Sequence, residues 1–182
     1  MRAMSEDSSR SDAELAAAYR SGDESAATEL VNRHGAALGR FLFGLGAPVL
    51  DVEDLVQEAF FRAFRGLDGW RGEASFRSWL LRIGANLRND QYRRERGRVV
   101  VPIEDHDLAG SADPEGEAGA SEMERKLREG LGHLPRLQRE VFLMRAQQGM
   151  AYDDICAALG TTPGAARVHY HHAVKRLKEM MQ

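Results

Sequence analysis

Three of the six histidines in this 182-residue chain, His169, His171 and His172, fall within the stretch "RVHYHHAVKRLK". Imidazoles at this density can bind a metal ion or transfer protons. Beside Arg167 and Lys175 they can also contact a polyanion. The residue types alone leave all three chemistries open, so the surrounding segments must decide between them.

A metal site has little support around this cluster. His169 and His172 are three residues apart and could share a metal ion, but no CxxC or HExxH spacing supplies further ligands. Cys156, the single cysteine, takes a helix position that needs a small buried residue, so we interpret it as a core thiol. The presence of a single cysteine also excludes an internal disulfide and fits a reducing cytoplasm. We therefore expect no metal and no other cofactor.

The histidines belong to an expected helix-turn-helix. A helix is predicted over residues 152–159, ending at Gly160, and Thr162 can cap a second helix that has Pro163 at its first position. Four positions of that second helix would pack inward: Ala166, Tyr170, Ala173 and Leu177. The opposite, exposed face carries Arg167, Val168, His171, His172 and Lys175, with His169 at its border. This arrangement is typical of a major-groove reading motif.

A second group of interest is arginine-rich. Residues 62–98 hold ten arginines against four acids. Ser75 can cap a long helix whose buried stripe is Phe76, Leu80, Ile83 and Leu87. The far face would present Ser78, Arg82, Asn86, Asn89 and Arg93, followed by Arg94, Arg96 and Arg98. Arginines contact phosphates, and aromatics and amides hold unstacked bases, so this face favours single-stranded nucleic acid. A merely solvated basic helix end is the alternative.

A third feature is an aromatic residue among charges. In "DVEDLVQEAFFRAF" a helix entered through Asp51 buries one apolar stripe. Phe61 falls on the opposite face, together with Asp54, Gln57 and Glu58. An aromatic anchor ringed by charge is typical of a partner-binding face. A lone exposed residue, or packing against the first helices, explains the pattern equally well.

The elements that position these groups are all predicted to be helical. Two further helices are expected over residues 11–21 and 23–45, and period-2 alternation is scarce. Residues 99–120 contain no Lys or Arg and six acids among Gly, Ala, Ser and Pro, a composition typical of a linker. We therefore predict an all-α chain with a disordered tail (1–10), a helical domain (11–97), a flexible acidic linker (98–120) and a second helical domain (121–182). No apolar run is long enough for membrane insertion.

Taken together, the two halves resemble an extracytoplasmic-function (group IV) sigma factor of the sigma-70 family. "DVEDLVQEAFFRAFRGLDGWRGEASFRSWLLRIGANLRND" resembles region 2 of that family, and "LPRLQREVFLMRAQQGMAYDDICAALGTTPGAARVHYHHAVKRL" resembles region 4. The linker is too short and polar for the region 3 domain of housekeeping members. The resemblance implies a cytoplasmic transcription initiation factor that recruits core RNA polymerase to promoters and is not an enzyme.

The resemblance also implies a role for each group. The docking face for the coiled coil of the largest polymerase subunit would be Asp51, Asp54, Gln57, Glu58 and Phe61. The −10 element would be recognised and opened by Arg71, Gly72, Ser75, Phe76, Arg82, Asn86, Asn89, Arg93, Arg94 and Arg96. The −35 element would be read by Thr162, Arg167, Val168, His171, His172 and Lys175. Further implied partners are the polymerase flap region, promoter DNA and a cognate anti-sigma factor.

The sequence departs from the family pattern at two places. Ala151 stands where members usually have the Ser or Thr that caps the scaffold helix. The missing cap should lower the stability of this helix by about 1 kcal/mol, which Asp153 and Asp154 in the first turn partly offset. Arg167 to Tyr170 replaces the common K/R-S-R-L. We therefore expect a different −35 sequence.

Other classes of function remain as alternatives. A helix-turn-helix regulator could bind duplex DNA without polymerase, although the Phe61 face and the basic helix argue against it. A zinc-dependent or redox-sensing protein would need ligands that the sequence does not supply. A nucleic-acid enzyme is the least supported, because no carboxylate cluster, nucleophile motif or phosphate loop is present.

Overall fold

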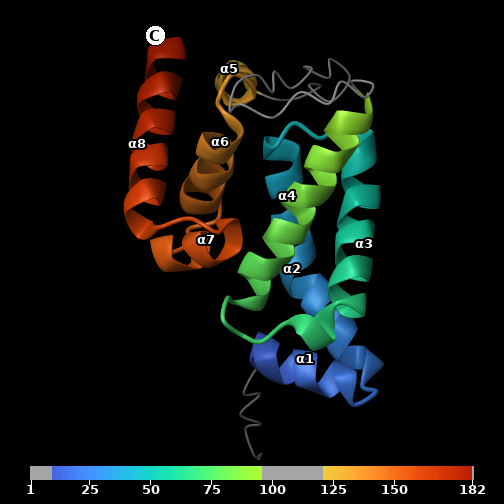
Figure 1. The fold of residues 1–182 in the computed structure, drawn as a ribbon. Helices are drawn as coiled ribbons and strands as arrows, with labels where there is room; N and C mark the ends of the chain where they lie inside the picture. Colours follow the sequence, from blue (N-terminus) through green and yellow to red (C-terminus); the bar gives the residue numbers. More distant parts are fainter. Residues whose placement is uncertain (1–9, 96–120, 182) are drawn as a thin grey trace, which may run out of the picture.

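A computed structural model of the chain describes residues 10–95 and 121–181 (Figure 1). Within these ranges all regular structure is helical, which confirms the predicted fold class. The N-terminal half consists of α1 (Asp12–Arg20), α2 (Glu24–Gly44), α3 (Val49–Arg65), the 3-10 helix η1 (Leu67–Gly69) and α4 (Phe76–Glu95). The C-terminal half consists of α5 (Glu122–Gly132), α6 (Arg136–Phe142), the π-helical turn η3 (Leu143–Gln147), α7 (Tyr152–Leu159) and α8 (Pro163–Met180).

Local capping explains where the first helices begin. Ser11 and Glu14 form a capping box at α1, and the Asp23 carboxylate accepts a hydrogen bond from the Ser25 N–H at the start of α2. Both helices agree with the predicted ranges. The third helix begins at Val49, after Pro48, so Asp51 lies in its first turn instead of at its entry. There its carboxylate suits the helix dipole.

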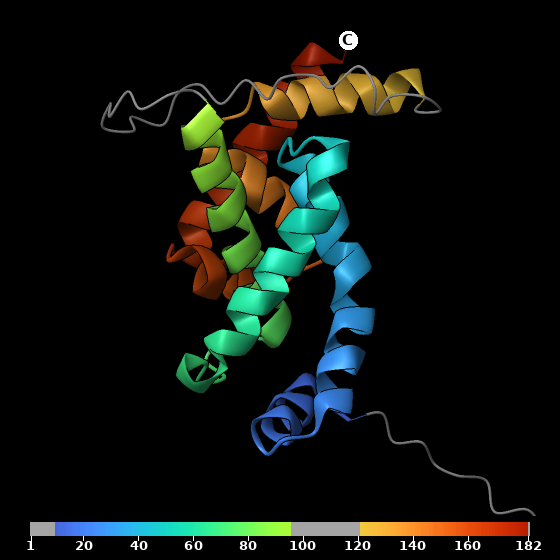
Figure 2. The ribbon, with the colours of Figure 1, turned by 90° about the vertical axis from the view of Figure 1, so that its right-hand side faces the viewer.

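The N-terminal half is organised around α2. Helices α3 and α4 pack along it, and α1 crosses its N-terminal end (Figure 2). Gly84 lets α2 and α4 approach closely, because a Cβ there would lie 2.8 Å from Cδ1 of the buried Leu38. The predicted stripe of α4 is buried at Phe76, Leu80 and Leu87, and Ile83 is half-buried beside them. This packing fixes which face of α4 can meet a ligand.

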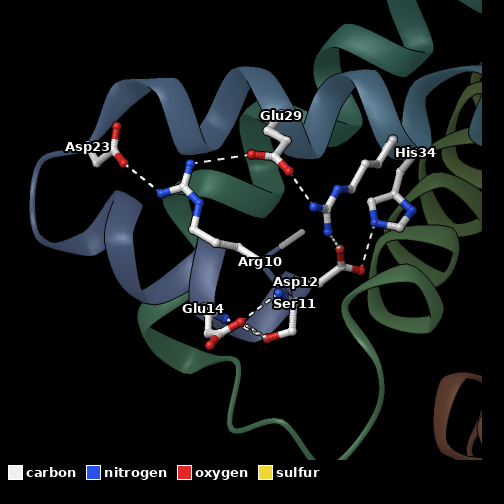
Figure 3. A network of polar contacts seen from close by, with 8 residues as sticks. Arg10, Ser11, Asp12, Glu14, Asp23, Glu29 and His34 are labelled. Carbon is white, nitrogen blue, oxygen red and sulfur yellow. Dashed lines mark hydrogen bonds and ion pairs between the residues drawn. The ribbon is translucent and has the colours of Figure 1, made fainter. Parts of the chain in front are cut away.

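A polar network ties α1 to α2 (Figure 3). Asp12 accepts hydrogen bonds from His34 Nε2 at 2.7 Å and from Arg33 at 3.2 Å, and Arg33 also pairs with Glu29. Arg10 pairs with Asp23 at 3.0 Å and with Glu29 at 3.3 Å. Arg10 is the last residue of the predicted disordered tail, residues 1–10. Residues 1–9 lie outside the described part.

The C-terminal half is a helix-turn-helix supported by two more helices. A capping box between Ser121 and Glu124 starts α5, and α6 packs on α8. Gly160, with φ +67°, ends α7 as predicted, and the Thr162 hydroxyl accepts from the Ala165 N–H to start α8. Ala151 makes no side-chain cap, also as expected.

The two halves pack side by side (Figure 1). Helix α4 contacts α7, and α2 contacts η3. Leu143 of η3 lies against Gly44, and the Arg128 guanidinium lies 3.9 Å from the centroid of the Phe43 ring. The sequence left this arrangement open. The predicted acidic linker, residues 98–120, lies outside the described residues.

No described helix is long and apolar enough to cross a membrane.

Candidate nucleic-acid interface

The loop between η1 and α4 is held in a defined shape by three side chains. The guanidinium of Arg20 donates hydrogen bonds to the carbonyls of Leu67 and Trp70. Trp70 in turn donates from Nε1 to the Ala74 carbonyl at 2.9 Å and stacks on Trp79, with ring centroids 6.3 Å apart. Gly72 adopts φ +75°, a conformation that favours glycine. Arg71, next to it, is exposed to solvent.

The first turn of α4 corrects two expectations. The hydroxyl of Ser75 accepts a hydrogen bond from the Ser78 N–H at 3.1 Å, so Ser75 caps the helix as predicted. Ser78 was expected on the exposed face but is fully buried, its hydroxyl bonded to that of Ser75. Phe76 is only 1% exposed and packs against Trp70 and His34. Phe76 therefore supports the loop and cannot touch DNA directly.

The rest of the α4 face divides into exposed and engaged residues. Arg82 and Asn86 are exposed. Arg93 is paired with Asp90 at 2.8 Å, and Arg94 is exposed, while Arg96 and Arg98 lie outside the described residues. Asn89 does not face solvent freely: its amide donates to the Glu140 carboxylate of α6 at 3.2 Å. Among the described residues, the exposed cations at this site are therefore Arg71, Arg82, Arg93 and Arg94, of which Arg93 is paired with Asp90.

The Phe61 face of α3 is open to solvent. Phe61 is 55% exposed, with the Arg65 guanidinium 5.5 Å from its ring centroid. Asp54 and Gln57 are also exposed, and Glu58 pairs with Arg62 at 2.6 Å. Asp51 is half-buried and accepts a 2.6 Å hydrogen bond from Gln91 of α4.

Sequence reasoning missed one member of this face. Leu50 is 81% exposed and precedes Phe61 by eleven residues, close to three full turns, so both lie on one side of α3. The signal was available in the helical spacing, but the helix was expected to begin at Asp51. An exposed apolar residue at each end, with acids between, is the geometry of a protein-docking face.

The exposed face of α8 matches the prediction. Arg167, His171, His172 and Lys175 are exposed, and Val168 is 52% exposed. The rings of His171 and His172 lie 6.2 Å apart, whereas His169 is half-buried with its Nδ1 away from solvent. No group of three or more metal-ligating side chains occurs within residues 10–95 and 121–181. The three histidines do not converge on one point.

Tyr152 is a second residue that the sequence did not single out. The guanidiniums of Arg145 and Arg167 each lie 5.1 Å from the centroid of its ring. Cation–π contact of this kind holds a long side chain in place. Arg167 is therefore positioned by α7 before it meets a ligand.

Cys156 lies behind this surface, in α7. Burial raises the pKa of its thiol, Asp153 raises it further, and Arg167 opposes the shift. The side chain is buried among apolar neighbours, as the core-thiol interpretation expects. A neutral, buried thiol is a poor nucleophile and a poor metal ligand.

Comparison with known proteins places both halves. Residues 30–98 match the family model "Sigma-70 region 2", and residues 124–177 match "Sigma-70, region 4". The chain is 33% identical to RNA polymerase sigma factor NccH of Alcaligenes xylosoxydans xylosoxydans, covering 94% of this chain and 95% of that one. It is 30% identical to ECF RNA polymerase sigma factor SigM of Mycobacterium tuberculosis (strain H37Rv), with 94% and 85% covered.

Two solved structures share the fold over most of their length. One is CnrH in complex with the cytosolic domain of CnrY, with a TM-score of 0.72 and 30% identity, covering 93% of this chain and 96% of that one. The other is the sigma factor RpoE in complex with the anti-sigma factor NepR from Bartonella quintana, with a TM-score of 0.65 and 25% identity, covering 85% and 95%.

Proposed function

The chain belongs to the ECF group of the sigma-70 family of RNA polymerase sigma factors. From this premise we propose which of its surfaces binds polymerase and which bind promoter DNA. Sigma factors are initiation factors and not enzymes. In this proposal residues 11–97 form region 2, residues 121–182 form region 4, and residues 98–120 connect them. The protein acts in the cytoplasm, where its polymerase is.

Helix α3 is the proposed docking face for the core polymerase. Phe61 supplies an exposed aromatic anchor, and Asp54, Gln57 and Glu58 supply the polar ring around it. Aromatic anchors within a polar rim contribute much of the binding energy at protein interfaces. The partner would be the coiled coil of the largest polymerase subunit, with region 4 on the flap region.

Helix α4 and the loop before it are the proposed −10 surface. Arg71 and Arg82 can contact phosphates, and Asn86 can hold the edge of an unstacked base. The Trp70–Trp79 stack, which Phe76 supports from below, fixes the loop. Contacts between this surface and unstacked bases would supply the free energy for strand opening.

Helix α8 is the proposed −35 reader. Arg167, Val168, His171 and His172 face the major groove, and Lys175 contacts phosphate. Thr162 serves mainly as a helix cap, since its hydroxyl already accepts the Ala165 N–H.

An anti-sigma factor is a further proposed partner. The related RpoE is known in complex with the anti-sigma factor NepR, and CnrH with the cytosolic domain of CnrY. Both complexes involve proteins whose fold covers most of this chain. We expect a cognate protein to bind this chain in the same manner.

The observation that carries the proposal is a pair of successive helices in one helical unit. Helix α3 presents an exposed aromatic residue surrounded by acids, and α4 presents exposed cations. The test is transcription by purified core polymerase from a randomised promoter library, with and without the protein. Enrichment of a common −10 and −35 pair only in its presence supports the proposal. Duplex binding by the protein with no affinity for core polymerase would instead identify the helix-turn-helix regulator.

Promoter geometry adds a requirement on the fold. The names of the two elements place them about 25 base pairs apart, roughly 85 Å along B-DNA at about 3.4 Å per base pair. A compact chain of this length has a radius of gyration of only about 16 Å. Two halves packed side by side cannot reach both elements at once, so promoter binding requires that they separate.

A further inference from the structure

We propose that Val168 reads the 5-methyl group of one thymine in the −35 element, so that thymine at this position distinguishes the promoters that the chain selects. The inference rests on the proposed function of α8. It adds the identity of one base to that function, and it assigns the choice of this base to a single apolar side chain.

Val168 lies near the middle of the exposed face of α8. An α-helix turns by about 100° per residue, so Gly164, His172 and Lys175 lie within about 40° of Val168 around the helix axis. All four residues are exposed. The middle of a helix face that enters the major groove is directed at the base edges on the groove floor. Val168 is therefore placed to contact a base instead of a phosphate.

The neighbours of Val168 on α8 leave its side chain uncovered. One turn before it, Gly164 has no side chain, and a Cβ built there would have no heavy atom within 4 Å. The long side chain of Arg167 lies toward α7, where its guanidinium is 5.1 Å from the centroid of the Tyr152 ring. Val168 is accordingly 52% exposed. The first turns of α8 can thus come close to the floor of a groove.

Helix stability does not account for a valine at this position. The branched Cβ makes valine a poorer helix former than alanine, and a half-exposed valine recovers little of this cost through core packing. The same stiffness favours binding. Because the side chain has one strongly preferred rotamer in a helix, its methyl groups are already in place and little rotamer freedom is lost on contact.

The charge around Val168 favours DNA over a protein as its partner. From Pro163 to Lys178 the sequence of α8 contains no Asp or Glu. Arg167 and Lys175 are exposed on either side of Val168 along the helix. Such cations contact phosphates and hold a helix in its groove. The centre of a protein interface is instead depleted of charged residues.

Thymine is the base that an apolar side chain can select in the major groove. It is the only one of the four bases that presents a methyl group there, whereas the others present only hydrogen-bonding groups. A polar group of adenine, guanine or cytosine that faced Val168 would lose water without gaining a hydrogen bond. Val168 therefore favours a T·A pair whose methyl group faces α8 and disfavours the alternatives.

The experiment measures binding of full-length protein, assembled with core polymerase, to a promoter duplex selected from the randomised library. Each thymine of the −35 element is replaced in turn by uracil, which lacks only the 5-methyl group. At one position the wild type should lose affinity about threefold to fourfold, as expected for one buried methyl group. Val168→Ala should bind the parent duplex more weakly and lose most of its sensitivity to uracil at that position.

Met180→Ala is the matched control. Met180 is an apolar residue of the same helix, 45% exposed and about three turns beyond Val168. This variant should respond to uracil as the wild type does. A second library selection with Val168→Ser should lose the preference for thymine at the one position and keep the rest of the element. Circular dichroism checks that each variant is folded.

Three results would overturn the inference: a selected −35 element without thymine, a wild type that tolerates uracil at every position, and equal sensitivity to uracil in the wild type and Val168→Ala. Weaker association of Val168→Ala with core polymerase, with unchanged discrimination of uracil, would instead identify Val168 as a protein contact. In each of these cases a selected −35 element would leave the proposed function standing. Selection of no −35 element by the wild type would refute the proposed role of α8 itself.

Discussion

Leu50 and Phe61 lie about three turns apart on one face of α3, with 81% and 55% of their surfaces exposed. Between them stand the exposed Asp54 and Gln57. Apolar ends with a polar middle make this face the best candidate for a protein partner, and it gives the first prediction.

Phe61→Ala should weaken binding of the protein to core polymerase by about tenfold or more, because an aromatic anchor contributes about 1–2 kcal/mol or more. Leu50→Ala should act in the same direction with a smaller effect. Val31→Ala, at a partly exposed apolar position on α2, is the control. Fluorescence anisotropy of labelled protein with purified core measures all three. An unchanged affinity for Phe61→Ala would remove the docking assignment.

The double variant Arg82→Ala, Asn86→Ala should impair promoter opening while leaving core binding intact. The variant loses a phosphate contact at Arg82 and a base-edge contact at Asn86, and a good base-edge contact is worth about 1–3 kcal/mol. Permanganate reactivity of thymines in the −10 region reports opening, and anisotropy reports core binding. Arg40→Ala, another exposed arginine, is the matched control. Loss of core binding in the double variant would contradict the separation of the two faces.

The double variant His171→Ala, His172→Ala should bind −35 duplex DNA more weakly than the wild type, because both imidazoles are exposed on the reading face and can hydrogen-bond to base edges. Affinity is measured at constant pH and ionic strength with the same duplex. Glu179→Ala, at another exposed position of α8, is the control. An unchanged affinity of the histidine variant would exclude these two side chains from the reading surface.

Cys156 should react with iodoacetamide at least about tenfold more slowly in the folded protein than in urea at the same pH, since its thiolate is disfavoured. The pKa of this thiol is raised in the fold, by burial first and by Asp153 second. The fold therefore favours the neutral thiol, which adds to the free energy of unfolding below the pKa of a thiol in the unfolded chain. This contribution is lost as the pH rises through the raised pKa of Cys156 in the folded protein. Fast alkylation of the native protein would show that α7 opens readily.

Ala151→Ser should stabilise the protein by about 1 kcal/mol, because α7 now lacks a side-chain cap. Urea unfolding followed by circular dichroism measures the change. Ala157→Ser places the same residue inside the same helix at an exposed position, where no free N–H awaits a cap, and should bring no gain. Equal effects at both positions would show that capping is not the cause.

Features set by neighbouring residues were predictable from the sequence. The caps at Ser75 and Thr162, and the stop at Gly160, each depend on a few adjacent positions, and each occurs as expected. The first two helices also agree with their predicted ranges. The exposed face of α8 followed from helical spacing alone. Local chemistry therefore accounts for the helices and for much of the candidate −35 surface.

Features set by distant residues were not predictable in this way. Ser78 falls on the polar side of the α4 wheel, yet it is fully buried, because helices α2, α3 and α7 all pack against α4. Asn89 meets Glu140 only because the two halves pack together, across a separation of 51 residues. Side-by-side docking depends on the shapes of two finished surfaces, which helical periodicity does not describe.

The contact between the Tyr152 ring and Arg167 has a consequence for how this protein would find its register on DNA. An arginine that is free in solution must give up rotamer freedom, of roughly 2 kcal/mol, when it binds a base. Arg167 has already given up part of that freedom in the unbound protein. Binding of Arg167 to a base edge therefore costs less entropy, and a swing of its side chain toward another base would first have to break the contact with Tyr152, which is worth about 0.5–1 kcal/mol.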